Sequence, residues 1–394
     1  MRNTISINRV YLIILQIFLY IYFMELIERV KKILESYYIC DECLGRQFHN
    51  LIPDMPNKER GKILRKYAQI ESSYSNKEYK EKEGEECYLC KNLFDKLDYF
   101  AQKVVDEMKD YEYSTFLIGS IIPKDLISRE EDFWEEFGID LCETFKSNFN
   151  RNVGIKVKKL CDKNTDFEKP DIMATIDIKN DKCLLQVSPV YIKGSYRKLY
   201  PRSGAQKIII NIFEKASKSK EGIFYSIGRL ENNVVTSAYR PFIIALKNPK
   251  KRNLNLNKLR EKLNLKKSIK VSRLSYCRKE DIELMKRDKI LASYSIFLKL
   301  NKFNKDIKEK LVSLEKKRII QILKNKIRKP YIRKIRLKFK DNDLEIYIES
   351  TVGFSINSFL SGRSKPNLKK LIGRFKVEKI ILRKYTKMKT YEMY

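Results

Sequence analysis

Apolar positions in the first third of the chain recur mainly at helical spacing. From Met24, apolar residues return every three or four positions, which predicts a helix over the next fifteen residues. A second helical pattern runs from Leu93 to Met108, and the apolar run Thr115–Ser120 is typical of a strand. A polar, helix-prone stretch rich in Lys and Glu separates the two helical patterns. Helices therefore dominate the first hundred residues, and mixed helix and strand follow them.

The last two hundred residues carry strand-like patterns instead. One apolar run extends from Cys183 to Ile192. In Leu344–Glu349 the apolar residues alternate with Glu and Tyr, so one face of this strand is buried. The turn Asp341–Asp343 joins this strand to the preceding basic segment and predicts a hairpin. With boundaries near 100 and 190, these patterns predict an α+β protein that ends in a mixed or antiparallel sheet.

An apolar run lies near the N-terminus. Residues Val10–Phe23 are almost wholly apolar, but fourteen residues are too few for a bilayer-spanning helix. No small-residue cleavage site follows them. The segment is either a membrane or partner anchor, or the result of an upstream start codon. We favour the start-codon interpretation, treat 1–23 as an N-terminal extension and do not expect a membrane partner.

The chain is strongly basic. The 394 residues include 83 Lys and Arg against 50 Asp and Glu, a formal net charge of +33. Such a surface attracts polyanions, and nucleic acid is the commonest of them. A lysine-rich coding bias is the alternative explanation. The segment Leu311–Lys340 holds twelve Lys or Arg and a single acid, and its apolar positions leave only one face available to RNA.

Four of the eight cysteines form two C-x-x-C pairs, and these predict a metal site. The pairs are Cys40 with Cys43 and Cys87 with Cys90. Two such pairs suit one tetrahedral zinc ion, and a closed four-cysteine site stabilises a fold without catalysing a reaction. Buried free thiols or a redox pair are the alternatives. The single histidine, His49, lies near the first pair and is interpreted as a structural or surface residue, with an extra zinc ligand as the alternative.

A short stretch after residue 190 interleaves cations with aromatic rings. Such a stretch can grip phosphates and stack on an exposed base, and a solvated strand edge is the alternative. The predicted RNA-binding residues are Lys193, Tyr196, Arg197, Lys198 and Arg202.

Several phrases, in order along the chain, resemble one enzyme family. They include Cys40-Asp-Glu-Cys-Leu-Gly-Arg-Gln-Phe48, Asn150-Arg-Asn-Val-Gly154, Phe167-Glu-Lys-Pro-Asp-Ile172, Tyr191-Ile-Lys-Gly-Ser-Tyr-Arg-Lys-Leu199 and Arg240-Pro-Phe242. Gly353-Phe354 and Lys365-Pro-Asn367 complete the series. Together they resemble the archaeal and eukaryotic tRNA pseudouridine synthases that act on the TΨC arm. The resemblance covers the chain from about residue 24 to the C-terminus.

The resemblance implies an architecture and a reaction. A zinc-binding helical segment would occupy 24–100, a THUMP-like RNA-binding region 101–190, and a pseudouridine synthase-like catalytic domain 191–394. The reaction would convert uridine to pseudouridine in the TΨC arm with an aspartate nucleophile. In the family this aspartate ends a Gly-Arg-Glu-Asp phrase, whereas this chain reads Gly228-Arg-Leu-Glu231.

The resemblance also implies roles for individual residues. Glu231 would be the nucleophile and Arg229 its positioning partner, while Tyr294 and Phe354 would form walls around the base. The alternative for Glu231 is a surface carboxylate on a degenerate loop. Structural zinc, no organic cofactor, no small-molecule substrate, tRNA as partner and a cytoplasmic location are expected. A relative that binds or remodels tRNA without isomerising it is the second hypothesis. A THUMP-bearing methyltransferase or thiouridine synthetase is disfavoured because no G-x-G-x-x-G phrase occurs.

Overall fold

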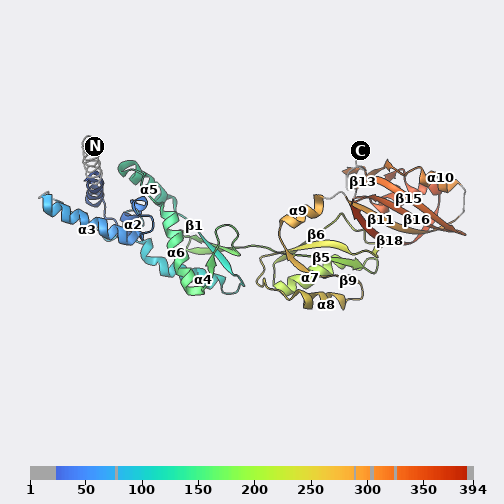
Figure 1. Ribbon diagram of the computed structural model, residues 1–394, viewed down its shortest axis with the longest axis horizontal. Helices are drawn as coiled ribbons and strands as arrows, with labels where there is room; N and C mark the ends of the chain where they lie inside the picture. The colour runs from blue at the N-terminus through green and yellow to red at the C-terminus, as the bar shows by residue number, and fades with distance from the viewer. Residues whose placement is uncertain (1–23, 76–78, 288–289, 302–305, 324–325, 388–394) are drawn as a thin grey trace, which may run out of the picture. The chain divides into compact units, whose positions relative to one another are not determined.

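The computed structural model describes residues 24–75, 79–287, 290–301, 306–323 and 326–387. The chain divides between Val187 and Ser188 into two compact units. The described residues form one hydrophobic core in the first unit and two in the second. Helices and strands occur in both units, so the fold is α+β (Figure 1). No helix within the described ranges is both long and apolar enough to span a membrane. The apolar run Val10–Phe23 lies outside the described residues.

The first unit is mostly helical and contains one small sheet. Residues 24–36 are helical. The later elements are α2 (Asp41–Arg46), η1 (His49–Leu51), α3 (Asn57–Ser75), η2 (Leu93–Lys96), α4 (Leu97–Met108), β1 (Thr115–Ile121), α5 (Lys124–Phe137), α6 (Phe145–Cys161), β2 (Asn164–Thr165), β3 (Ile172–Asp177) and β4 (Lys182–Val187). The sheet has the order β2-β1-β3-β4, with β1 parallel to β2 and β3, and β3 antiparallel to β4.

The apolar periodicity of the first unit explains its core. The positions from Leu26 to Leu34 that predict a helix are buried in the helix of residues 24–36. The helical pattern from Leu93 to Met108 is also confirmed, as η2 followed by α4. The predicted strand at Thr115 is β1, whose Phe116 and Ile118 enter the same core.

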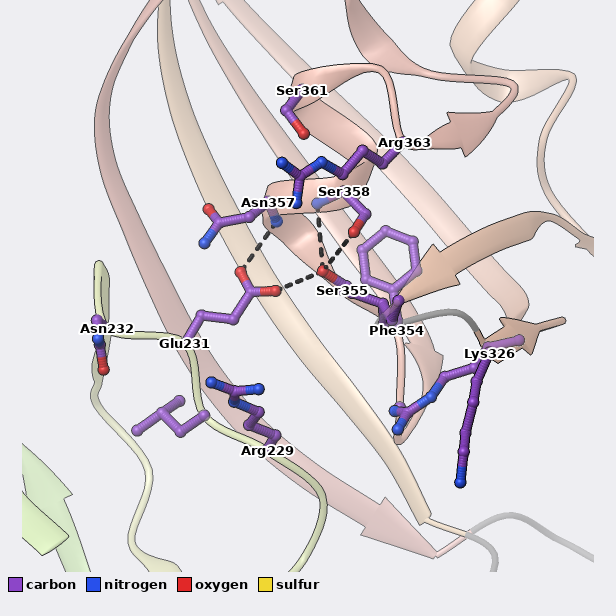
Figure 2. Close-up of a pocket in the computed structure, with 14 residues that line it drawn as sticks. Arg229, Glu231, Asn232, Lys326, Phe354, Ser355, Asn357, Ser358, Ser361 and Arg363 are labelled. Atoms are coloured by element: carbon purple, nitrogen blue, oxygen red, sulfur yellow. Dashed lines mark hydrogen bonds between the residues drawn. The ribbon is translucent and has the colours of Figure 1, made fainter.

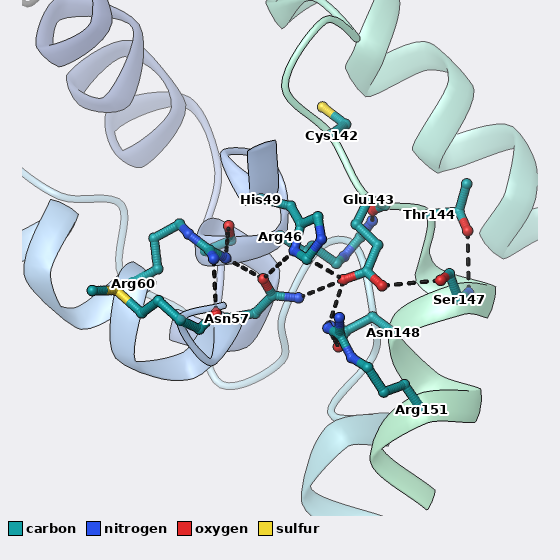
Figure 3. Close-up of polar contacts among 12 residues, drawn as sticks. Arg46, His49, Asn57, Arg60, Cys142, Glu143, Thr144, Ser147, Asn148 and Arg151 are labelled. Atoms are coloured by element: carbon teal, nitrogen blue, oxygen red, sulfur yellow. Dashed lines mark hydrogen bonds and ion pairs between the residues drawn. The ribbon is translucent and has the colours of Figure 1, made fainter. Parts of the chain in front are cut away.

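A buried carboxylate joins the start of α6 to the N-terminal helices (Figure 3). The Glu143 carboxylate accepts hydrogen bonds from Asn57 Nδ2 at 2.8 Å, Ser147 Oγ at 2.9 Å and Arg151 Nη2 at 2.7 Å. Its backbone carbonyl accepts one from Arg46. Because buried charges cost free energy unless they are paired, this network favours one arrangement of the helices.

The described residues of the second unit form three sheets. Its elements are β5 (Val190–Lys198), α7 (Ala205–Ser217), β6 (Glu221–Ser226), β7 (Val234–Thr236), β8 (Arg240–Lys247), α8 (Leu256–Asn264), β9 (Ile269–Val271), β10 (Ser275–Cys277), α9 (Glu280–Arg287), β11 (Ile290–Leu300), α10 (Asp306–Val312), β12 (Lys317–Arg318), β13 (Ile320–Leu323), β14 (Lys326–Arg328), β15 (Tyr331–Lys340), β16 (Asp343–Thr351), α11 (Ile356–Ser361), β17 (Ser364–Lys365), α12 (Leu368–Ile372) and β18 (Phe375–Lys387). The sheet orders are β10-β5-β8-β6, β12-β15-β16-β11-β18-β7 and β14-β13-β17, and β9 also pairs with β5.

The apolar run from Cys183 to Ile192 is not one strand. The structure divides it into β4 and β5, which lie on either side of the unit boundary. Pro189 explains the break, because proline has no backbone N–H to donate to a strand ladder. The apolar residues at both ends of the run therefore enter two different cores.

The predicted C-terminal hairpin is confirmed. β15 and β16 are antiparallel partners, and the chain turns at Asp341, whose φ is 50°. Leu344, Ile346 and Ile348 are buried, as the alternation predicts. Glu349 on the opposite face is also buried. Its carboxylate accepts hydrogen bonds from Arg333 Nη1 at 2.9 Å and Ser293 Oγ at 3.4 Å, and these offset the cost of burying its charge.

Candidate functional site

The structure brings the two cysteine pairs together in the first unit. The Sγ atoms of Cys40, Cys43, Cys87 and Cys90 all lie within 4.8 Å of one another. Cys40 immediately precedes α2 and Cys43 is within it, while Cys87 and Cys90 belong to a turn before η2. Among the described residues, this is the one cluster of Cys, His or acidic side chains found to suit a metal ion.

The spacing of the sulfur atoms fits a tetrahedral metal ion. With metal–sulfur bonds of about 2.3 Å, the edges of a tetrahedral zinc site are about 3.8 Å long. The Sγ atoms of Cys40 and Cys90 are 3.7 Å apart. Cys40 N also donates a hydrogen bond to Cys87 Sγ at 3.3 Å, a contact that stabilises a thiolate. The cluster can therefore hold a metal ion. His49 hydrogen-bonds instead with Asn57, at 3.2 Å.

The second unit contains a cavity of about 610 Å³, a size typical of ligand sites (Figure 2). The loop between β6 and β7 forms one side, and the β13–β14 hairpin and the start of α11 form the others. Among the described residues that line it, Glu231 is the only acidic one. The cationic lining residues are Arg229, Lys326, Arg328 and Arg363. No ion pair in the described part of the chain involves these four side chains, so the cavity favours an anionic ligand.

Both carboxylate oxygens of Glu231 are hydrogen-bonded at the start of α11. Oε1 accepts from Ser355 Oγ at 2.6 Å, and Oε2 accepts from Asn357 N at 2.9 Å (Figure 2). Ser355 is the N-cap of this helix, and its Oγ also accepts from Ser358 N. Two bonds to two different donors leave the carboxylate little freedom to rotate. Glu231 is therefore held at the cavity in one orientation.

Two buried cations hold the loop that carries Glu231. Lys198 Nζ donates to the carbonyl oxygens of Glu231 at 3.3 Å and Asn232 at 2.5 Å. Arg240 Nη2 donates to the carbonyl oxygens of Ile227 at 2.6 Å and Gly228 at 2.5 Å. Burial lowers the pKa of Lys198. These contacts fix the loop on both sides of Arg229.

Gly228 allows the close approach within this loop. Its φ is +60°, in a region that side chains other than glycine rarely adopt. A Cβ at this position would lie 2.5 Å from Cγ1 of Val352, which directly precedes Gly353 in the cavity wall. A larger residue at position 228 would therefore clash with the cavity wall, which explains the glycine in the Gly228-Arg-Leu-Glu231 phrase.

The structure separates the two predicted base-stacking residues. Phe354 lines the cavity with Arg229 and Glu231, although it is largely buried and packs against Phe359. Tyr294 is not among the lining residues. It is buried within β11, and this burial raises the pKa of its hydroxyl. Of these two aromatic residues, Phe354 borders the cavity and Tyr294 does not.

The predicted RNA-binding stretch is divided by strand alternation. Lys193 and Arg197 lie on one face of β5, where Lys193 is exposed and Arg197 stacks on the Tyr239 ring at 5.0 Å. Tyr196 and Lys198 lie on the opposite face and are buried in this structure. Arg202, beyond the strand, is exposed. Three of the five predicted side chains are therefore at least partly accessible to a ligand.

The residues that complete the cavity come from distant parts of the sequence. Ser355 and Asn357 follow Glu231 by more than 120 residues, and Lys326 and Arg328 belong to the β13–β14 hairpin. The phrases Arg240-Pro-Phe242 and Gly353-Phe354 do stand out in the sequence. Their contacts with the β6–β7 loop and the cavity depend on the tertiary fold.

Comparison with known proteins places these units in one family. The model described as "Pus10 THUMP domain, archaeal" matches residues 100–177, and the model described as "Pus10, C-terminal" matches residues 178–382. The tRNA pseudouridine synthase Pus10 of Pyrococcus furiosus is 29% identical over 374 residues, covering 89% of this chain and 95% of the relative. The Thermofilum pendens protein of the same name is 25% identical, covering 89% and 93%.

Among solved structures, a Cbf5-Nop10-Gar1 complex matches 48% of this chain and 48% of the matched chain, with 12% identity and a TM-score of 0.31. That similarity is weak. The C-terminal Pus10 model, in contrast, spans more than half of the sequence, including the cavity and its loop. The chain therefore belongs to the Pus10 family.

Proposed function

We propose that this protein converts uridine to pseudouridine in the TΨC arm of tRNA, at tRNA positions 54 and 55. The observation that carries this proposal is the cavity of the second unit, where Glu231 is the one carboxylate among four cations that form no ion pair within the described ranges. The cations attract the phosphates of a nucleotide that has left its helix, and the carboxylate is oriented beside them. The Pus10 relatives, named as tRNA pseudouridine synthases, give the reaction class.

In this reaction Glu231 acts as the nucleophile, and its attack splits one difficult step into two. A Glu231 carboxylate oxygen bonds to C1′ as the N1–C1′ bond of the nucleotide breaks. The uracil then turns, and its C5 displaces the carboxylate from C1′ to form the C5–C1′ bond. One proton leaves C5 and one is gained at N1, so the isomerisation needs no oxidant, reductant or cosubstrate. Arg229 neutralises charge beside the nucleotide, and Phe354 provides an apolar wall.

The first unit supplies a structural metal in this proposal. Cys40, Cys43, Cys87 and Cys90 bind one Zn²⁺, because four thiolates at tetrahedral spacing are the usual ligands of a closed zinc site. With four protein ligands, the ion has no open position for a substrate. The thiols, none of them in a disulfide, suit the cytoplasm, where we place the protein.

A second candidate function is tRNA binding without isomerisation. The contacts of Glu231 favour it, because Ser355 Oγ and Asn357 N engage both carboxylate oxygens as in a helix cap. A carboxylate in this role stabilises α11 and need not attack a nucleotide.

The experiment that separates the two functions begins with an unmodified tRNA transcript. The purified protein is incubated with the transcript, and pseudouridine is mapped by chemical labelling and primer extension. A protein-dependent pseudouridine in the TΨC arm is the expected result. Salt-sensitive tRNA binding without product would contradict isomerisation and support the binding function.

A further inference from the structure

A row of cations lies on the face of β15 that points away from the core. It consists of Lys334, Arg336, Lys338 and Lys340, called the β15 row below. The alternate residues Ile335, Leu337 and Phe339 pack against the core of the second unit. A register shift between Ile332 and Lys334 lets Ile332 and Ile335, which are three residues apart, both face the core. The basic composition of this segment is thus concentrated on one side of the sheet.

The neighbouring strand compensates little of this charge. Arg336, Lys338 and Lys340 are exposed, and Lys334 is half-buried. Two acids opposite the row on β16 are engaged by other arginines, since Glu349 pairs with Arg333 at 2.9 Å and Glu345 with Arg383 at 3.6 Å. A third acid, Asp343, lies opposite Lys340 beside the turn. No ion pair found in the described ranges involves the β15 row.

The dimensions of the row fit a nucleic-acid backbone. Side chains two residues apart on an antiparallel strand are separated by about 7 Å, so the four cations extend over about 20 Å. One strand of duplex DNA carries a phosphate every 3.4 Å or so along the axis, so a length of about 20 Å covers several phosphates. β11, β15 and β16 contribute none of the strongly exposed apolar side chains that membrane-surface binding requires.

We infer that the β15 row is a second RNA-binding surface, which holds the phosphate backbone of a tRNA outside the cavity. This inference rests on the proposed function for the identity of the RNA. The row contacts phosphates and carries no information about base sequence, so it positions the RNA and does not select it. The hairpin places the row in the same six-stranded sheet as β11 and β18 (Figure 1).

Two matched quadruple variants test the inference. The test variant carries Lys334→Gln, Arg336→Gln, Lys338→Gln and Lys340→Gln. The control carries Lys258→Gln, Lys262→Gln, Lys266→Gln and Lys267→Gln, which removes the same charge from exposed positions in and after α8. Binding of a fluorescent tRNA transcript to each full-length protein is measured by anisotropy over a series of salt concentrations. Thermal unfolding verifies that both variants are folded, and the pair Lys338→Gln with Lys340→Gln replaces the test variant if it is not.

The test variant should bind tRNA about 10- to 100-fold more weakly at low salt. Each lost phosphate contact should also reduce the slope of log K against log salt by about 0.7 to 0.9. The control should stay within about twofold of the wild type. Equal weakening in both variants would overturn the inference, because net charge alone would then explain binding. Unchanged tRNA binding, with lost binding to phosphatidylserine vesicles, would also overturn it. The tRNA affinity and its salt dependence are measured without product formation, so they remain informative if the protein does not isomerise uridine.

Discussion

Charged side chains such as Glu143 are paired in the interior of the first unit, whereas those at the cavity of the second unit have no ion-pair partner among the described residues. In the first unit, the Glu143 carboxylate is buried and accepts hydrogen bonds from three side chains, and the four cysteines form a closed cluster. In the second unit, four cations border an open cavity without ion-pair partners among the described residues. Satisfied polar groups stabilise a fold, whereas unpaired ones at a cavity favour a ligand. We therefore expect stability and chemistry to depend on different units.

The largest effect is expected at the cysteine cluster, which we expect to stabilise the first unit. Cys43→Ser should remove the metal and lower the unfolding temperature of the first unit by at least about 10 °C, because metal binding contributes several kcal/mol to folding. Cys277→Ser, outside the cluster, should retain the metal. Elemental analysis and calorimetry measure both effects. A Cys43→Ser protein with a full complement of metal would contradict the site.

A smaller loss is expected from the buried Arg46–Glu130 ion pair. Arg46 is fully buried and its Nη1 donates to Glu130, so Arg46→Met leaves a buried carboxylate uncompensated. Breaking such a pair costs about 3–5 kcal/mol. Lys91→Met, which removes an exposed pair with Glu86, should cost less than about 1 kcal/mol. Urea unfolding compares the two variants, and equal losses would contradict this distinction.

Lys198 tests whether the anchor of the Glu231 loop belongs to the chemistry of the second unit. Lys198→Met removes both hydrogen bonds from Nζ to this loop, and a displacement of about 1 Å can lower the rate about a hundredfold. The affinity for tRNA should change by less than about twofold, because Lys198 is buried. Single-turnover pseudouridine formation and tRNA anisotropy measure the two quantities separately.

The control for this prediction is Lys207→Met. Lys207 is an exposed residue of α7, so its substitution should leave both rate and affinity near those of the wild type. A Lys198→Met protein that binds tRNA much more weakly but reacts at the wild-type rate would show that Lys198 contacts RNA instead of positioning the loop.

The smallest effect is expected at Gly228. Gly228→Ala combines an unfavourable positive φ with a clash against Val352, and should cost about 1–3 kcal/mol of stability in the second unit. Gly362→Ala has a φ of +92° but nothing within 4 Å of the added Cβ, so it measures the backbone contribution alone. Chemical denaturation of both variants gives the difference. A larger loss for Gly362→Ala would contradict the steric explanation.

Local patterns were enough to predict several elements of the fold. The helix after Met24, the helix ending at Met108 and the β15–β16 hairpin each follow from periodicity and a turn. The cysteine cluster was also predictable, because each C-x-x-C pair places two thiols close together, and two such pairs are the usual pattern of a four-cysteine metal site.

The candidate site was less predictable, because its contacts are long-range. A period of two separates Tyr196 and Lys198 from Lys193 and Arg197, but the sequence does not show which face of β5 is buried. The hydrogen bonds from Ser355 and Asn357 to Glu231 depend on the packing of distant elements. Composition therefore indicates RNA binding, while the fold decides which cations are available for it.

Single-turnover pseudouridine formation by Glu231→Gln tests most directly whether the Glu231 carboxylate is the nucleophile. Glutamine keeps the size of the side chain but removes the charge and the nucleophile, while Glu231→Asp keeps the carboxylate. We expect no product with Glu231→Gln, measurable product with Glu231→Asp, and metal content and tRNA affinity close to wild type in both. Product formation by Glu231→Gln at the wild-type rate would contradict the assignment of the chemistry to this carboxylate.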